Sequence, residues 1–510
     1  MSTATLSPAP KRKSAAKHFR AASLGVGPFD SLMADFQAAT YSAANPIIQT
    51  ISQGTTWLPV STDSLGPIHF YWQNGSFFNA YTWNYINNLF AYNQINNNYY
   101  TNGDGLNTAL YNAFSAISYV LSSTDQATVN QAYLNNTGDM ATLVSNYING
   151  GYSTVPAGTT QAQYNYVLQQ MLDWSQPSGS TMPPVSYTTF FQSPNPAALL
   201  PYAPPGAAQL IKQLIAIVNK MGAANAIIGA QQAVVSELSN VLKNIQGPVN
   251  YSTSNPTPAG WMALVDDNGP VSSCEPQWIL NPPAATITTG LETGSSFTVR
   301  LTVTDIDNST CNVSVNGGAG VSVGVGFFGI NASTSASYDL STITENITQL
   351  DVTMTFNGVT NISMVPSAYN ISTSAGWWLP SILSQAVNYN SAVSGPYMPP
   401  SAYNFNQDGN FGVLNNLFIS QLPAMELTFT TINADEINQI FTTTTSWGVD
   451  FLGIDFGGGS STSTYTSHVS DYSSNSITIT MAPPSFPSSL PSNDQTAFVI
   501  GASLTWPGAK

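Results

Sequence analysis

The spacing of apolar residues changes near residue 260, and this change constrains the fold more than any other feature of the chain. Between residues 28 and 247, apolar residues recur every three or four positions, which is typical of one face of a helix. Beyond residue 260, apolar and polar residues alternate, as in Phe297–Thr304 and Ile477–Met481, which is typical of half-buried strands. The sequence therefore predicts an α+β fold, with a helix-rich N-terminal domain followed by a mainly antiparallel, sandwich-like β domain.

These patterns divide the chain into four parts. The first, residues 1–27, is a basic arm that we expect to be disordered. A helical domain is predicted over 28–247, with one long helix over about 207–245, because its apolar stripe continues without a break. Residues 248–260 are rich in Pro, Gly, Ser and Asn and predict a linker, which leaves 261–510 as the β-rich domain.

Two segments of the β-rich domain, 321–356 and 447–481, resemble each other. Each contains Phe-x-Gly-Ile followed by Asn or Asp, then a Ser-rich stretch, then an alternating strand. Nearly equal gaps between these features predict an internal repeat, although a Ser/Thr-rich composition also produces such likeness by chance.

Charged residues make up only 7% of the 510 positions, against about 25% in ordinary soluble proteins. From residue 21 onward, 5 basic residues face 25 acidic ones, a net charge of −20. A body of that sign repels phosphate backbones, so we expect no nucleic acid on the folded part. Because so low a charge density weakens repulsion between copies, we expect a homo-oligomer.

The arm has the opposite charge. It carries five basic residues and no acidic one, and it lacks an apolar stretch of the length found in secretory signal peptides. We therefore expect either a cytoplasmic protein or one exported by a non-classical route. The composition also fits a transit peptide or a tail that binds a polyanion. The five basic residues are Lys11, Arg12, Lys13, Lys17 and Arg20.

The two cysteines, Cys274 and Cys311, both lie in the β-rich half. They are compatible with one disulfide in an oxidising compartment and with two thiols in a reducing one.

Catalytic motifs are poorly represented. The three histidines, His18, His69 and His468, are far apart in sequence and belong to no metal or triad pattern, which favours a non-enzymatic protein. A glycan-active hydrolase stays open as an alternative because it needs only two carboxylates at a suitable separation. The acids that such an enzyme would use are Asp435, Glu436, Asp450 and Asp455.

One cofactor, Ca²⁺, is suggested by two short motifs. Asn404, Asn406 and Asp408 precede a glycine and resemble the first half of an EF-hand loop, but that loop begins with Asp and ends with Glu. Asp305 and Asp307 form a second oxygen-rich stretch. Ordinary turn formation is the simpler explanation of both.

Trp377 and Trp378 are adjacent aromatic residues ahead of a Leu-Pro pair. They predict either an exposed patch that binds sugar or protein, or packing at a hinge.

The Gly/Ser-rich strand segments carry the most information about function. Val321, Val323, Val325 and Phe327 project from one face of an extended chain, and Ser and Gly occupy the other face. A second such segment follows Trp447. Strands with one apolar and one small polar face are typical of barrels that contact lipid, although sandwich strands share the same period.

One short stretch resembles a known family. Trp447, Gly448 and Phe451, followed by two adjacent glycines, are similar to the signature of the perforin-like (membrane-attack-complex) pore formers. Val449 and Asp450 stand where that family carries Thr and His. The resemblance implies strands that insert into a membrane.

We therefore expect a non-enzymatic, membrane-active or toxin-like protein that oligomerises and forms pores through its Gly/Ser-rich strands. The alternatives are a structural protein that self-assembles or binds carbohydrate at a surface, and the glycan hydrolase. The expected partners are a membrane or glycan surface and further copies of the chain.

Overall fold

The structure is a computed structural model. It describes residues 28–59, 105–176, 184–246, 259–266, 269–307, 309–324, 326–332, 347–387, 411–444, 465–484 and 496–506, together with the short stretches 68–69, 73–74, 77–80, 83–84, 86–87, 257, 337–339, 389, 397–398, 403–406, 446–451 and 454–455. The basic arm and most of the predicted linker lie outside these ranges, so the expectations about them stay predictions.

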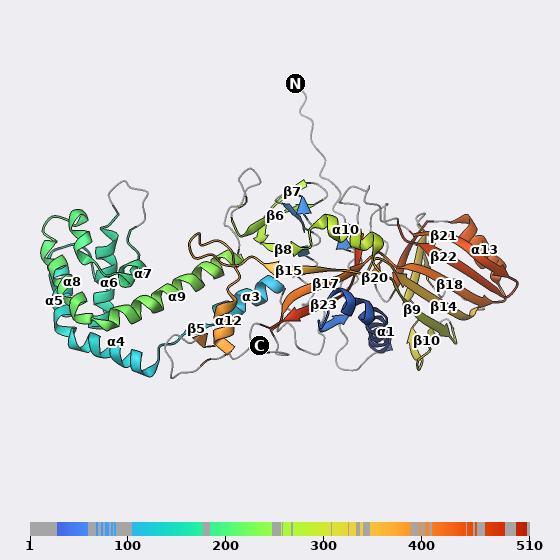
Figure 1. Cartoon of the computed structure of the whole chain (residues 1–510), viewed down its shortest axis with the longest axis horizontal. Coiled ribbons are helices and arrows are strands. Elements are labelled where there is room, and N and C mark those ends of the chain that lie inside the picture. Colours follow the sequence, from blue (N-terminus) through green and yellow to red (C-terminus); the bar gives the residue numbers. More distant parts are fainter. Residues whose placement is uncertain are drawn as a thin grey trace, which may run out of the picture.

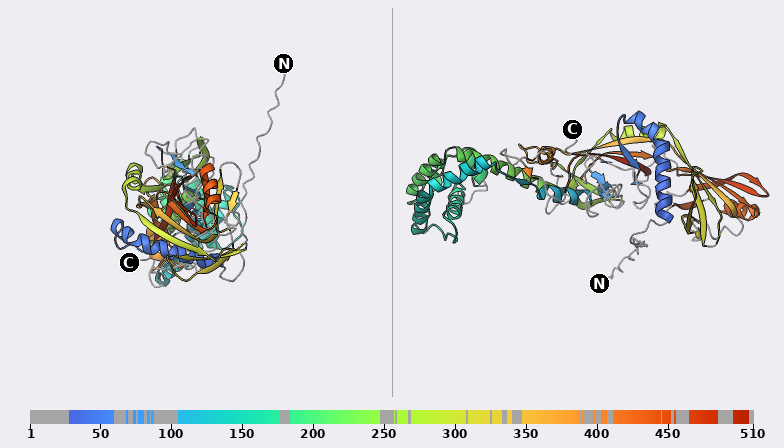
Figure 2. Two further views of the ribbon diagram at one scale, coloured as in Figure 1. Left: turned by 90° about the vertical axis from the view of Figure 1, so that its right-hand side faces the viewer. Right: turned by 90° about the horizontal axis from the view of Figure 1, so that it is seen from below.

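The molecule is elongated, with helices at one end and a large curled antiparallel sheet at the other (Figures 1 and 2). Most helices come from the N-terminal half and most strands from the C-terminal half, which confirms the predicted α+β class. The helices before residue 247 are α1 (Pro28–Ile51), α3 (Leu106–Ser115), α4 (Ser123–Asn135), α5 (Thr137–Asn149), α6 (Thr160–Asp173), α7 (Tyr187–Gln192), the 3₁₀ helix η2 (Pro196–Tyr202), α8 (Ala208–Met221) and α9 (Ala223–Gln246). Those after it are α10 (Ala284–Thr293), α12 (Pro380–Val387) and α13 (Ala434–Thr443).

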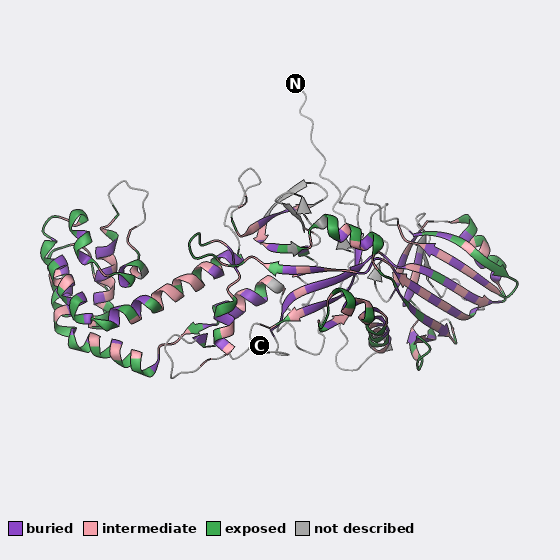
Figure 3. Cartoon of the chain, viewed as in Figure 1, coloured by how far each residue is buried: buried purple, intermediate pink, exposed green. Residues whose placement is uncertain are grey.

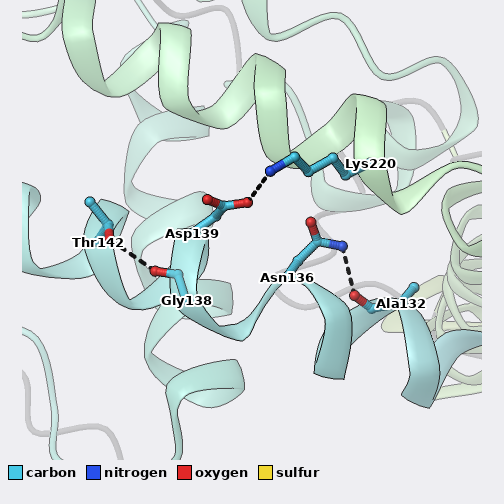
Figure 4. A network of polar contacts seen from close by, with 6 residues as sticks. All are labelled: Ala132, Asn136, Gly138, Asp139, Thr142 and Lys220. Atoms are coloured by element: carbon cyan, nitrogen blue, oxygen red, sulfur yellow. Dashed lines mark hydrogen bonds and ion pairs between the residues drawn. The ribbon is translucent and has the colours of Figure 1, made fainter.

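The helical lobe consists of α4 to α8 and the first half of α9, which enclose a core of their own. Ser122 caps α4 by accepting a hydrogen bond from the backbone N–H of Asp125 at 3.0 Å. Lys220 in the last turn of α8 pairs with Asp139 in the first turn of α5 at 2.5 Å (Figure 4). Each charge lies at the helix end whose dipole it complements, although both side chains are about half exposed, so the pair adds little stability.

The predicted long helix is in fact two helices. Between α8 and α9 the chain bends by 94° at Gly222, whose φ of 50° and ψ of −124° suit only glycine. The buried side chain of Asn225 then donates to the carbonyl oxygen of Val218 at 2.8 Å, which supplies a partner where the helical ladder stops.

The large sheet is built from β9 (Phe297–Thr304), β10 (Thr310–Val315), β11 (Val321–Gly324), β12 (Phe328–Ala332), β13 (Ser337–Asp339), β14 (Ile347–Phe356), β18 (Ala424–Thr431), β19 (Ser446–Phe451), β20 (Ile454–Asp455), β21 (Tyr465–Ser473) and β22 (Ser476–Ala482). Its strand order is β11-β10-β9-β14-β18-β22-β21-β19-β12-β13, and β20 pairs with β19. Only three residues separate β11 from β12, yet they lie near opposite ends of this order. The sheet must therefore curl until its two ends approach each other.

The inner face of the curled sheet holds the largest core, and α1 closes it. Val299, Leu301 and Val303 of β9 alternate inward in the predicted way and are fully buried. Leu32 and Phe36 of α1 join the same core. Helix α1 therefore belongs with the β-rich part, which corrects the predicted 28–247 helical domain. Helix α1 packs on the apolar inner face of the sheet and so removes part of that face from water.

A second core lies in the middle of the molecule. A six-stranded sheet there contains β1 (Trp57–Pro59), β2 (Ile68–His69), β8 (Trp278–Asn281), β15 (Thr360–Pro366), β17 (Val413–Ser420) and β23 (Thr496–Thr505). A four-stranded sheet contains β3 (Gln73–Asn74), β4 (Phe77–Asn79), β6 (Trp261–Asp266) and β7 (Gly269–Pro276), and β5 (Ser118–Tyr119) pairs with β16 (Tyr397–Met398). Val241 and Ile245 near the end of α9 pack into this core. Helix α9 thus packs in the helical lobe at its start and in the middle core at its end.

The two segments of the predicted repeat are not arranged alike. The strands of 321–356 are spread over both ends and the middle of the large sheet, whereas β19, β21 and β22 of 447–481 are direct neighbours. Moreover, β12 of the first segment pairs with β19 of the second. Similar Ser/Thr-rich sequences therefore occupy different positions in one sheet.

Candidate functional surface

The outer face of the large sheet is a polar surface that four neighbouring strands position. We define the hydroxyl face as the outward side chains of β9, β14, β18 and β22. Each of these side chains is exposed or half-buried, so no described helix covers this face (Figure 3). Its members are Thr298, Arg300, Thr302, Thr304, Gln349, Asp351, Thr353, Thr355, Glu426, Thr428, Thr430, Ser476, Thr478 and Thr480.

Cross-strand hydrogen bonds hold the hydroxyl face in order. Thr302 Oγ1 donates to Asp351 Oδ1 at 2.6 Å, and the Thr428 and Thr478 hydroxyls are 3.1 Å apart in directly opposed positions. The result is a grid of donors and acceptors with the strand spacing of about 4.8 Å. Such a grid can bind a flat polar surface, either a sugar or a second protein.

The predicted lipid-facing residues lie in the core instead. Val323 and Phe327 are fully buried and Val321 is half-buried, while Val325 lies outside the described residues. The ring centroids of Phe327 and Phe451 are 6.3 Å apart in an edge-on contact. The apolar face of this segment thus points into the curled sheet and not outward.

Trp377 and Trp378 do not form an exposed patch. Trp377 is 0% exposed, and its Nε1–H donates to the carbonyl oxygen of Gln277 at 2.9 Å. Its ring packs edge-on against Trp278 at 5.2 Å, and Trp378 contacts Phe114 of α3. The pair therefore joins the middle core.

The candidate calcium residues form turns. Asn404 Oδ1 accepts from the backbone N–H and the side-chain amide of Asn406, at 3.1 and 2.9 Å, whereas Asp408 lies outside the described residues. Asp307 accepts four hydrogen bonds from Ser309 and Thr310 in the β9–β10 turn. Two of them come from backbone N–H groups, and they lower the pKa of Asp307 to about 2. Among the described residues, no three His, Cys, Asp or Glu side chains are grouped to hold a metal ion.

Both cysteines are free thiols. Cys274 lies half-buried in β7 of the four-stranded sheet, and Cys311 is buried in β10 of the large sheet. Burial raises the pKa of each thiol to about 11, so neither is a reactive thiolate at neutral pH. The sequence is compatible with one disulfide or with two thiols, and the structure contains two thiols.

The four acids considered for a hydrolase fall into two pairs. Asp435 and Glu436 occupy the exposed first turn of α13, whereas Asp450 and Asp455 are register partners in β19 and β20. The two pairs belong to different elements.

One partly buried carboxylate was not predicted from the sequence. Glu275 of β7 accepts hydrogen bonds from the side chains of Trp83 and Asn107, the latter at 3.1 Å. Burial raises the pKa of this carboxyl above its ordinary value, because water stabilises the charged form better than the protein does. No local motif identifies it, since its partners lie over 160 residues away in sequence.

Because the pKa of Glu275 is higher in the folded than in the unfolded state, this residue makes the stability of the protein depend on pH. Its contribution to stability is complete below its unfolded pKa of about 4.3 and is lost as the pH rises through the higher folded value. We therefore expect the stability of the wild type relative to Glu275→Gln to fall between pH 4 and pH 7. Thermal unfolding of both proteins across this range measures the difference. The exposed Glu426→Gln is the control, and a pH-independent difference for Glu275→Gln would contradict the assignment.

Within the described residues, no individual helix has both the length and the apolar composition of a membrane span. The bent pair α8–α9 meets both criteria only when its two helices are taken together.

Comparison of the chain with protein-family models, with curated proteins and with solved structures finds no match. The short resemblance to the pore formers is therefore not accompanied by a family match.

Proposed function

We propose that this chain is a structural protein that assembles with copies of itself and presents a neutral, hydroxyl-rich surface. The observation that carries this proposal is the hydroxyl face, a broad sheet surface that is ordered by its own hydrogen bonds and is not covered by any described helix. Catalysis would require convergent titratable groups, whereas contact between surfaces requires only such a grid.

Two further features support assembly. Among the described strands, β11 and β13 at the two ends of the large sheet each pair along one edge only, and such edges favour pairing with another chain. In addition, the low charge of the body gives little repulsion between copies. Together these features favour association through neutral contacts.

Size-exclusion chromatography with light scattering and electron microscopy of the purified protein tests the proposal. We expect a defined oligomer or particle, and a stable monomer at all concentrations would contradict it. Thr428→Lys places a charge in the middle of the hydroxyl face and should weaken assembly. Thr142→Lys, on exposed α5 of the helical lobe, is the matched control and should leave assembly unchanged.

Carbohydrate binding by the same face is a more specific version of this proposal. The hydroxyl, carboxylate and guanidinium groups of Thr353, Glu426 and Arg300 lie in adjacent positions across β9, β14 and β18. A glycan array with the assembled protein tests this version, and binding lost in Arg300→Ala would support it. An array without hits would remove sugar binding and leave assembly in place.

Membrane activity is our second proposal. It is supported by the near closure of the large sheet, in which only three residues connect β11 at one end of the strand order to β12 near the other. We rank it second because Val323 and Phe327 would first have to leave the core. Dye release from liposomes over a range of pH and lipid composition tests it, and intact vesicles in every mixture would contradict it.

A further inference from the structure

One end of the large sheet gathers acidic side chains from three connections. The strand register places five residues at one level of the sheet, each at a strand end or within two positions of it. These are Thr304, Gln349, Thr430, Ser476 and Ser473. The connections that follow at this edge bring together five exposed acids, which we call the acidic rim. These are Asp305, Asp307, Asp435, Glu436 and Asp471.

Exposed apolar side chains lie at the same end of the sheet as the acidic rim. Ile432 is 75% exposed and Tyr472 is 45% exposed, and the Tyr472 hydroxyl bonds to the Asp435 carboxylate. Both side chains lie at the rim because Ile432 directly follows β18 and Tyr472 lies near the end of β21. Among the described residues, Ile432 is the most exposed large apolar side chain, so this end of the sheet offers apolar as well as acidic groups to a partner.

The rim has almost no charge of the opposite sign nearby. Between residues 297 and 482 the sequence contains twelve acidic residues, and Arg300 is its only Lys or Arg. Arg300 lies four positions before Thr304, so it belongs to the hydroxyl face and not to the rim. Because its acids are spread over several neighbouring strands and α13, the rim fits a partner whose positive charge is spread along a chain.

We propose that the acidic rim binds the basic N-terminal arm of a second copy of this chain. The arm carries Lys11, Arg12, Lys13, Lys17 and Arg20 with no acid, and Phe19 supplies an apolar group among them. Its charge and its aromatic residue thus complement the acids and the exposed apolar side chains of the rim. The inference rests on the proposed self-assembly and adds to the hydroxyl face a second contact between copies.

The position of the rim suits a contact between copies. The opposite end of the same strands faces the six-stranded sheet, because Phe356 of β14 contacts Phe498 of β23. The rim is consequently at the far tip of the elongated molecule, beside α13 (Figure 1), where a neighbour can approach it. The arm precedes α1, and its 27 residues can extend to about 90 Å, which is enough to leave its own molecule.

Carbodiimide cross-linking of the full-length protein, which joins lysine amines to carboxylates, locates the contact. We mix equal amounts of ¹⁵N-labelled and unlabelled chains and expect Lys11, Lys13 or Lys17 joined to Asp435, Glu436 or Asp471 in mixed-isotope pairs. One molar salt should suppress these links because the Debye length falls to about 3 Å. Links to the rim within single-isotope pairs only, or links to other acids without preference, would overturn the proposal.

Light scattering of three full-length variants separates this inference from the proposed function. Asp435→Asn/Glu436→Gln/Asp471→Asn should raise the dissociation constant of the assembly about tenfold, which is the effect of three weak ion pairs together. Replacing the five basic arm residues with Gln should do the same. The control Asp35→Asn/Asp173→Asn/Glu292→Gln removes three exposed acids outside both the rim and the hydroxyl face and should have little effect.

If both charge variants assemble like the wild type, the arm contact is wrong and self-assembly stands. If the wild type itself remains monomeric, the proposed function is wrong, and the inference that depends on it is overturned with it.

Discussion

Replacing Phe451 with alanine is expected to lower the free energy of unfolding by about 3–5 kcal/mol, the usual loss for a fully buried phenylalanine. Phe451 is 0% exposed and its ring contacts those of Phe36, Phe327 and Phe328 at 5.3, 6.3 and 6.3 Å between centroids. These three rings come from α1, from the turn after β11 and from β12. One side chain therefore joins the covering helix to both ends of the curled sheet.

Chemical denaturation followed by tryptophan fluorescence measures the loss, because Trp447 lies in the same core. The control is Leu134→Ala on α4, where a leucine that is 68% exposed should change stability by less than about 0.5 kcal/mol. A loss below about 1 kcal/mol for Phe451→Ala would mean that α1 and the sheet ends are only loosely held. That outcome would favour membrane activity over assembly, since the Gly/Ser-rich strands could then leave the core at low cost.

The large sheet could be predicted from the sequence because its strands alternate strictly. Val299, Leu301 and Val303 point inward, and the threonines between them form the hydroxyl face. The same pattern does not reveal the partner of each strand. Pairing of β12 with β19 joins residues that are over 100 positions apart, and only the curl of the sheet explains it.

The errors in the helical half have two physical causes. A glycine within an apolar stripe, such as Gly222, is compatible with a straight helix, so the bend depends on packing and not on local preference. In α1, Leu32 and Phe36 define an apolar face but do not specify whether that face meets other helices or a sheet. Long-range packing decides both cases, and this packing could not be predicted from a single sequence.

The acidic rim shows the same limit for a functional surface. Asp305, Asp435 and Asp471 are separated by up to 166 positions and share no motif, so only strand register brings them to one edge. The charge of the arm, in contrast, is plain from the sequence. The composition thus indicates a positively charged arm and a negatively charged body. The fold indicates where the negative charge is concentrated.

Replacing Trp377 with alanine is expected to lower the free energy of unfolding by about 3–5 kcal/mol without changing the binding of any ligand at the surface. The indole is fully buried, and its removal would leave the Gln277 carbonyl oxygen without this donor and Trp278 without its edge-on neighbour. Denaturation monitored by circular dichroism, together with a glycan array, separates the two effects. The control is Tyr202→Ala, an aromatic side chain that is 49% exposed and should be nearly neutral. Unchanged stability with loss of glycan binding in Trp377→Ala would instead restore the exposed-patch interpretation, because only a side chain at the surface can bind a sugar without supporting the fold.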